Sequence, residues 1–254
     1  MSRIEREFSV SEPCRVAVSL ASAEVAIIEG NAGTIGVVVE GNDRAVELVE
    51  VEQEGDTVSV RLQKGERRWN VRKVAVRISV PAGAAVSVRT ASGDLRVTVP
   101  VSDAEIDTAS SDVRLAGFDG LCRIKTASGD VVVGASSGGM RVMSASGDLR
   151  LDGFRGDLSV STASGDVVLG EVEGMIAVRT ASGDVDVRRF SGTRLEASSM
   201  SGDVTVGLAS GMVIDADVQT LSGSFRNRVS PSSAERSTSA ELKIKTLSGD
   251  VILR

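Results

Sequence analysis

Residues 162–185 read TASGDVVLGEVEGMIAVRTASGDV, so the phrase T-A-S-G-D-V occurs twice, once around Asp166 and again around Asp184. Close variants of this phrase recur along the chain. From Asp94 to Asp184 the aspartate of each copy lies 18 residues after the aspartate of the copy before it. The interval then lengthens, and Ser224 stands in the aspartate position of the eighth copy. Nine copies over residues 90–254 predict a repeat protein. The aspartates of this column are Asp94, Asp112, Asp130, Asp148, Asp166, Asp184, Asp203 and Asp250.

Each repeat contains two short segments in which apolar residues alternate with polar ones. Val167 and Leu169 follow Asp166 at one and three residues, and Ile176 and Val178 follow it at ten and twelve. Period-two alternation predicts strands with one buried face. Two strands of about five residues and two glycine-containing turns fill the repeat, which leaves no room for a crossover helix. We therefore expect an all-β fold, a parallel two-sheet β-solenoid with about 18 residues per coil, in which each coil stacks on its neighbours.

Three further columns of the repeat carry structural expectations. A hydroxyl residue lies four positions before each aspartate and is expected to bond along its own column or to turn backbone. The next column is alanine up to Ala181, which suggests a tight corner, and its later members are larger, which suggests a wider coil. Phenylalanines six positions after the aspartate are expected to fill the core. These larger residues and phenylalanines are Met200, Leu221, Leu247, Phe118, Phe154 and Phe190.

Residues 1–80 follow the pattern less closely. Residues 16–25 resemble a degenerate coil, and alternation predicts strands at 35–39, 46–51, 57–62 and 74–80, with a hairpin turn at 53–56. We interpret residues 1–80 as a less regular β N-terminal cap of the same domain and residues 81–254 as the regular solenoid. The polar stretch 230–240 is expected to be a mobile loop, and the final strand, residues 251–253, to be an open edge suited to self-association.

Composition narrows the function classes. The chain has 254 residues, a net charge of −6 and no histidine, so the usual general base and histidine-based metal or nucleophile sites are absent. The acidic balance argues against nucleic acid as a partner. The two cysteines, Cys14 and Cys122, are far apart in the chain and are expected to be buried thiols in a reducing compartment.

Targeting signals are not apparent in the sequence. The opening residues MSRIEREF alternate in charge and contain no apolar segment, so no signal peptide is expected. No stretch approaches the length of a membrane span. We therefore expect a cytoplasmic protein without direct membrane insertion.

The repeat T-x-S-G-D-V, together with the preceding segment VPAGAAVSVRTASGDL at residues 80–95, resembles the bacterial toastrack β-strand-repeat family, a putative-adhesin domain of unknown function. The resemblance covers nearly the whole chain. It implies a β-solenoid without established catalysis, found near membrane-anchored components of envelope-stress systems. It supplies no catalytic or binding residues to carry over.

The aspartate column is the main chemical candidate, because stacked turns place like charges about 5 Å apart. Calcium-binding β-rolls have a repeat of the same length, but they use two acidic turns per coil, whereas this chain has one. The favoured interpretation is that each aspartate accepts backbone N–H bonds of its own turn.

A carbohydrate-cleaving site is the second chemical candidate. It would need two facing carboxylates, and Arg150 beside Asp152 and Asp157 offers only surface charge. We expect no catalytic residues, no cofactor and no metal, and we interpret the chain as a non-catalytic structural scaffold or protein-interaction module that binds a protein partner or itself. The alternative is a cation- or glycan-binding module that uses the S-G-D turns.

Overall fold

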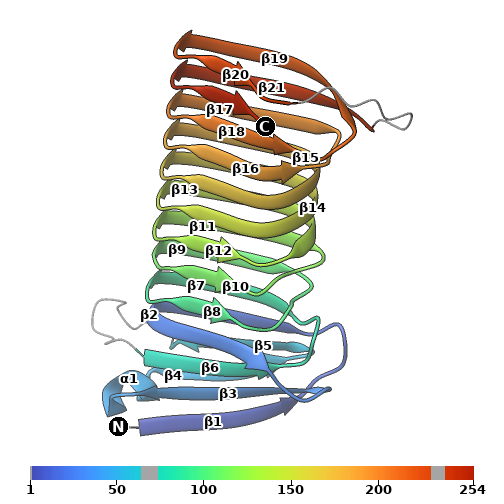
Figure 1. Ribbon diagram of the computed structural model, residues 1–254. Coiled ribbons are helices and arrows are strands. Elements are labelled where there is room, and N and C mark those ends of the chain that lie inside the picture. The colour runs from blue at the N-terminus through green and yellow to red at the C-terminus, as the bar shows by residue number, and fades with distance from the viewer. Residues whose placement is uncertain (1, 64–73, 230–237) are drawn as a thin grey trace. The chain divides into compact units, whose positions relative to one another are not determined.

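The computed structural model describes residues 2–63, 74–229 and 238–254. Strands dominate it, and the described residues include one short helix, so the all-β prediction is confirmed (Figure 1). The chain divides into two compact units, Met1–Asp130 and Val131–Arg254. The predicted division at residue 80 and the two-sheet solenoid geometry stay predictions. The expected loop at 230–240 lies mostly outside the described residues, and a strand begins at Thr238.

The first unit contains, among its described residues, eleven strands and the helix. Its elements are β1 (Ser2–Ser9), β2 (Arg15–Glu29), β3 (Thr34–Gly41), α1 (Asp43–Glu47), β4 (Val49–Glu54), β5 (Thr57–Leu62), β6 (Val74–Val80), β7 (Ala85–Ser92), β8 (Leu95–Val97), β9 (Ala104–Ser110), β10 (Val113–Leu115) and β11 (Leu121–Ser128).

Parallel pairing in the first unit follows the repeat. Strand β7 pairs with β9, and β9 with β11, so that Val88, Ile106 and Ile124 form one buried column. Strand β2 joins the same ladder from far away in sequence, because Val16 pairs with Val86 and Val25 with Leu95. The predicted degenerate coil at 16–25 is therefore in register with the regular repeats.

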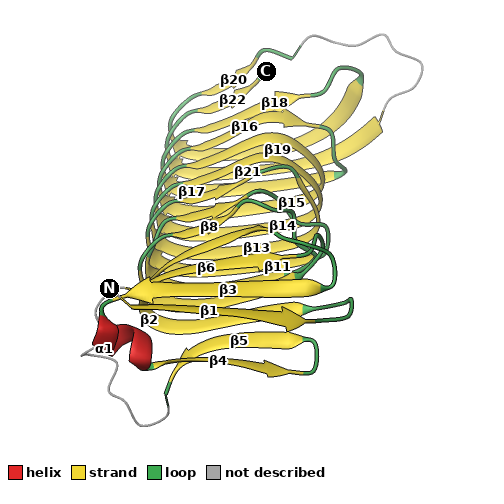
Figure 2. Ribbon diagram, turned by 90° about the horizontal axis from the view of Figure 1, so that it is seen from below, coloured by secondary structure: helices red, strands yellow, loops and turns green. Residues whose placement is uncertain are grey.

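The far side of β2 carries the irregular elements. Strands β5 and β6 run parallel to β2, β4 forms an antiparallel hairpin with β5, and β3 lies antiparallel between β6 and β1 (Figure 2). The hairpin turn predicted at 53–56 is confirmed. The strand predicted at 46–51 is confirmed only from Val49, because Val46 and Glu47 belong to helix α1 and Leu48 is its C-cap. The Asn42 side chain accepts the N–H of Ala45 at 2.7 Å and caps the helix, and the consecutive buried residues Ala45 and Val46 break the alternation.

The second unit is more regular. Its strands are β12 (Val131–Val133), β13 (Ser136–Ser146), β14 (Leu149–Ser164), β15 (Val167–Ser182), β16 (Val185–Phe190), β17 (Arg194–Ser201), β18 (Val204–Leu208), β19 (Met212–Ser222), β20 (Phe225–Asn227), β21 (Thr238–Ser248) and β22 (Val251–Leu253). Its strands pair in parallel, and Leu149 pairs with Val167, its equivalent in the next repeat.

The last two repeats exchange places in space relative to their order in the chain. Strand β21 lies between β17 and β19, and β22 lies between β18 and β20 (Figure 1). The expectation that residues 251–253 form an open edge is therefore wrong. Val251 and Leu253 are fully buried, and both neighbouring strands hydrogen-bond to β22.

The core consists of the inward columns of β-branched and leucine side chains. Phe118, Phe154 and Phe190 are buried, as expected.

The two cysteines are buried free thiols, and burial raises the pKa of Cys122 to about 12. Cys14 directly precedes β2, and Cys122 lies on β11, three strand spacings or roughly 14 Å along the ladder. A disulfide needs Cα atoms within about 7 Å of each other. The prediction of buried thiols is confirmed.

Candidate functional site

The aspartate column forms hydrogen bonds from one repeat to the next. The Oδ1 atom of Asp166 accepts the backbone N–H of Asp184 at 2.9 Å, and that of Asp184 accepts the N–H of Asp203 at 2.8 Å. In return, the carbonyl of Asp184 accepts the N–H of Val167 at 2.9 Å. Equivalent carboxylate bonds join the turns at Asp112 and Asp130, Asp148 and Asp166, Asp203 and Asp250, and Asp250 and Ser224. Asp94 lies in the same column, where its carbonyl accepts the N–H of Val25.

This geometry corrects one expectation. The carboxylates accept N–H bonds, but from the neighbouring repeat and not from their own turn. These charge-assisted bonds offset the like-charge repulsion at the steps where they form. At Asp250, the backbone N–H of Ser224 and the guanidinium of Arg226, 3.6 Å away, hold the pKa of the carboxyl below its usual range. Within the described part of the chain, no group of three or more acidic or cysteine side chains could hold a metal ion.

Glycine and threonine make these close turns feasible. Gly165 has a φ of +116°, and a Cβ atom there would clash with the carbonyl oxygen of Gly147. The hydroxyl of Thr162 donates to the carbonyl of Ser164 at 2.8 Å, so it bonds to turn backbone, one of the two arrangements expected for its column. The S-G-D turn is therefore specified by repeat-to-repeat packing, which explains its recurrence without a ligand.

The charged residues considered for glycoside cleavage lie on an outer face. Arg150 pairs with Asp152 at 3.3 Å, and both side chains are more than half exposed. Asp157 is also exposed and faces Met175 of the next repeat. The geometry places no second carboxylate opposite Asp157 in that register.

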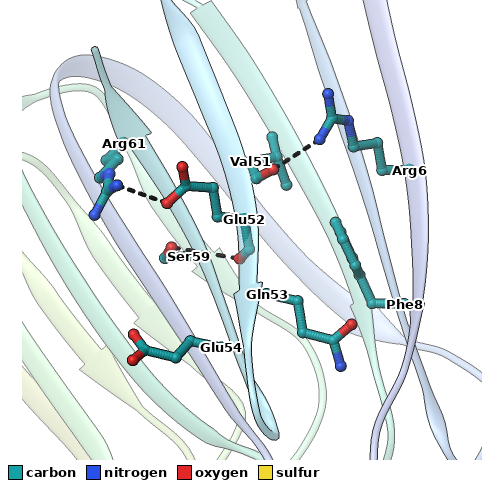
Figure 3. Close-up of a pocket in the computed structure, with 8 residues that line it drawn as sticks. All are labelled: Arg6, Phe8, Val51, Glu52, Gln53, Glu54, Ser59 and Arg61. Atoms are coloured by element: carbon teal, nitrogen blue, oxygen red, sulfur yellow. Dashed lines mark hydrogen bonds and ion pairs between the residues drawn. The ribbon is translucent and has the colours of Figure 1, made fainter. Parts of the chain in front are cut away.

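A pocket of about 430 Å³ lies in the first unit between β1 and the β4–β5 hairpin (Figure 3). Arg6 donates to the carbonyl of Val51 at 2.9 Å, and Arg61 donates to Glu52 at 2.6 Å. Nothing in the sequence indicates this pocket, because β1 and β4 are far apart in the chain. The Nε atom of Arg61 is buried without a hydrogen-bond partner among the described residues and lies 3.5 Å from the Glu50 carboxylate. The pocket is therefore a gap between the β1 edge and the β4–β5 hairpin in which protein groups already contact both arginines.

Exposed apolar side chains gather on the last three strand layers of the second unit. The alanine column points outward. The tight corner and the wider coil expected from this column stay predictions. Its later members Met200, Leu247 and Leu221 occupy neighbouring strands and are 58, 51 and 83% exposed. We call these three residues the apolar ridge. The sequence identified these residues as the larger members of their column but did not indicate that their side chains are exposed.

No helix among the described residues is long and apolar enough to span a bilayer. The search of curated proteins found no match. Among solved structures, a putative adhesin from Bacteroides fragilis is 13% identical, with a TM-score of 0.52, and the alignment covers all of this chain and 97% of that one. That likeness concerns the fold.

Two further solved structures come from Parabacteroides distasonis. A putative lipid binding protein is 15% identical with a TM-score of 0.45, covering 99% of this chain and 96% of its own. A putative adhesin is 12% identical with a TM-score of 0.44, covering 99% and 97%. The family model described as Toastrack DUF4097 matches residues 15–254, nearly the whole sequence. The chain therefore belongs to the Toastrack family.

Proposed function

We propose that this chain is a non-catalytic scaffold, a parallel two-sheet solenoid that binds a protein partner in the cytoplasm and serves a bacterial envelope-stress or membrane-associated system. The apolar ridge is the observation that supports binding. Contiguous apolar side chains on a folded surface are costly in water and mark interaction sites. Leu221, Leu247 and Met200 form such a column across three neighbouring strands.

The aspartate column supports a structural role instead of chemistry. Its carboxylates accept backbone N–H groups of the next repeat, as between Asp166 and Asp184. The alternative hypothesis, a cation- or glycan-binding module on these turns, has no specific geometric observation in its favour. It predicts that calcium raises the unfolding temperature, whereas the scaffold predicts the same temperature with calcium and with a chelator.

Site-specific photo-crosslinking in the native host tests the interaction function. A photoreactive phenylalanine analogue replaces Leu221 in one strain and Ala163 in another. Ala163 is the matched control, because it is an exposed member of the same turn column on β14. The proposal predicts a discrete adduct from position 221 that is absent or much weaker from position 163. Equal labelling at the two positions, or no adduct at position 221 across growth and envelope-stress conditions, would overturn it.

A further inference from the structure

The second unit ends in an open sheet edge. Among the described residues, β19 pairs with β21 alone, and β20 pairs with β22 alone. The inward columns are therefore uncovered at their last layer. Ala216 is exposed and Val218 partly exposed, whereas their register partners Leu242 and Ile244 on β21 are fully buried. Phe225 is likewise 46% exposed, next to buried Val251.

This edge has few of the features that keep strand edges from pairing. Charged residues, and lysine above all, are the usual protection of an exposed edge. In the first unit, edge strand β1 carries Arg3, Glu5, Arg6 and Glu7, and Arg6 reaches a backbone carbonyl of β4. Strand β19 has no basic residue, and Asp215 and Asp217 are its only charges. The edge is thus open to an added strand of suitable chemistry.

The charges of the outer face indicate what that chemistry is. Asp217 pairs in register with Lys243, which pairs with Glu196, so charge alternates in sign along this column. Asp215 lies beside Glu241, whose side chain binds Arg194 at 3.2 Å. A strand added to β19 would continue the alternation at Asp217 if it placed a basic side chain there. A basic side chain opposite Asp215 would offset the like charges of Asp215 and Glu241, because opposite charges across strands are favourable.

A second copy of this chain is disfavoured at the edge when β19 pairs with itself around Ala216. A two-fold axis at that register would lay β19 antiparallel to itself and bring the Asp215–Asp217 segments of the two copies together without a cation between them. Like charges opposite one another across strands are destabilising. The two aspartates therefore disfavour self-pairing and favour a basic partner.

Resting on the proposed interaction function, we infer that β19 receives an extended segment of another protein in which basic residues alternate with apolar ones. The basic residues face Asp215 and Asp217, and the apolar residues cover Ala216 and Val218. A further apolar residue extends the apolar ridge beyond Leu221. Backbone bonds to the free edge give affinity, and the side chains give specificity.

Labelled peptides test this inference with the full chain. The peptide KVKVTTL matches the expected pattern opposite residues 215–221, and EVEVTTL differs only in charge. Fluorescence anisotropy should show about tenfold tighter binding of the basic peptide, since two favourable charge pairs replace two like-charge pairs. Hydrogen exchange should show new protection in β19.

Matched variants separate edge binding from general attraction to an acidic protein. The double variant D215N/D217N should lose the preference for the basic peptide. The double variant D152N/D157N removes the same charge from exposed positions of β14, away from the edge, and should keep the preference. In light scattering, D215N/D217N should also self-associate at concentrations where the unmodified protein is monomeric.

Three results would overturn the inference: equal binding of the two peptides, equal loss in both double variants, or protection outside β19 and β20. Self-association of the unmodified protein through β19 would assign the edge to a second copy. Each of these results is compatible with a crosslinked adduct at position 221, so the proposed function would still stand. The absence of that adduct would instead overturn the proposed function itself.

Discussion

Gly165 illustrates how the distance between neighbouring repeats dictates the turn sequence. Its positive φ is unfavourable for other residues, and its Cα hydrogen faces the carbonyl of Gly147 in the preceding repeat. The S-G-D phrase predicts a turn here. It does not show that the constraint comes from the preceding repeat, because that contact exists only after stacking.

Replacing Gly165 by alanine should lower the free energy of unfolding by about 1–3 kcal/mol, the usual cost of an enforced unfavourable backbone conformation. Gly153→Ala is the matched control, because a Cβ atom there meets its nearest neighbour at 3.8 Å. Urea unfolding followed by circular dichroism measures both variants. Equal midpoints for the two would show that the turn tolerates a side chain.

Asp166 should act as a hydrogen-bond acceptor and not as a cation ligand. Asp166→Ala leaves the N–H of Asp184 without its partner and should cost about 0.5–1.5 kcal/mol. Asp166→Asn retains an acceptor oxygen, so its stability should stay within about 0.5 kcal/mol of the parent. Urea unfolding in chelator tests both. Comparable losses in the two variants, combined with stabilisation of the parent by calcium, would restore the cation-binding interpretation.

Asp250 should make the last repeats sensitive to acid. Its folded-state pKa is lowered, first by the backbone N–H of Ser224, so its ionised form stabilises the fold. That contribution is complete above the ordinary aspartate pKa of about 3.9 and is lost as pH falls through the lowered folded value. A carbon-detected NMR titration of the Asp250 carboxyl should give a midpoint below the ordinary value. A midpoint at or above it would contradict the hydrogen-bonded arrangement.

At the scale of elements, the exchange of the last two repeats was beyond sequence reasoning. Residues 220–223 and 246–249 both read TLSG, so either strand fits beside β17 by motif. The difference lies in the inward residues. Strand β21 offers Leu242 and Ile244, which fill a covered layer, whereas β19 offers Ala216 and Val218. Burying the larger pair releases more apolar surface from water and favours β21 in the interior.

Cysteine pairs test the order of these strands in a background in which Cys14 and Cys122 are replaced by alanine. Ser198 pairs with Lys245, and Lys245 pairs with Gln219. Cysteines at 198 and 245, or at 245 and 219, are one strand spacing apart and should form a disulfide on oxidation. Cysteines at 198 and 219 are two spacings apart, about 10 Å, and should not. Non-reducing electrophoresis reads the result, and a disulfide between 198 and 219 would contradict the order.

For the whole molecule, the all-β class is predictable from the sequence because inward positions such as Val167 and Leu169 repeat at a fixed period. The hydroxyl column is predictable too, and at Thr162 it takes the turn-backbone bond, one of the two arrangements expected. Helix α1 is not, because a local cap overrides the strand pattern, and neither is the pocket between β1 and β4. The open edge is not predictable, because the sequence shows only the order of strands along the chain. That order points to the final strand, β22, whereas the structure has the edge at β19 and β20. The open edge at β19, on which the proposed interaction depends, is therefore found only in the folded arrangement.

Residue-resolved hydrogen exchange on the full chain would locate the open edge. The structure predicts slow exchange throughout β22, which is hydrogen-bonded on both sides, and fast exchange at alternate amides of β19, whose outer side has no partner among the described strands. Addition of the basic peptide should slow those β19 amides. Fast exchange in β22 together with uniform protection of β19 would contradict both the strand order and the binding edge.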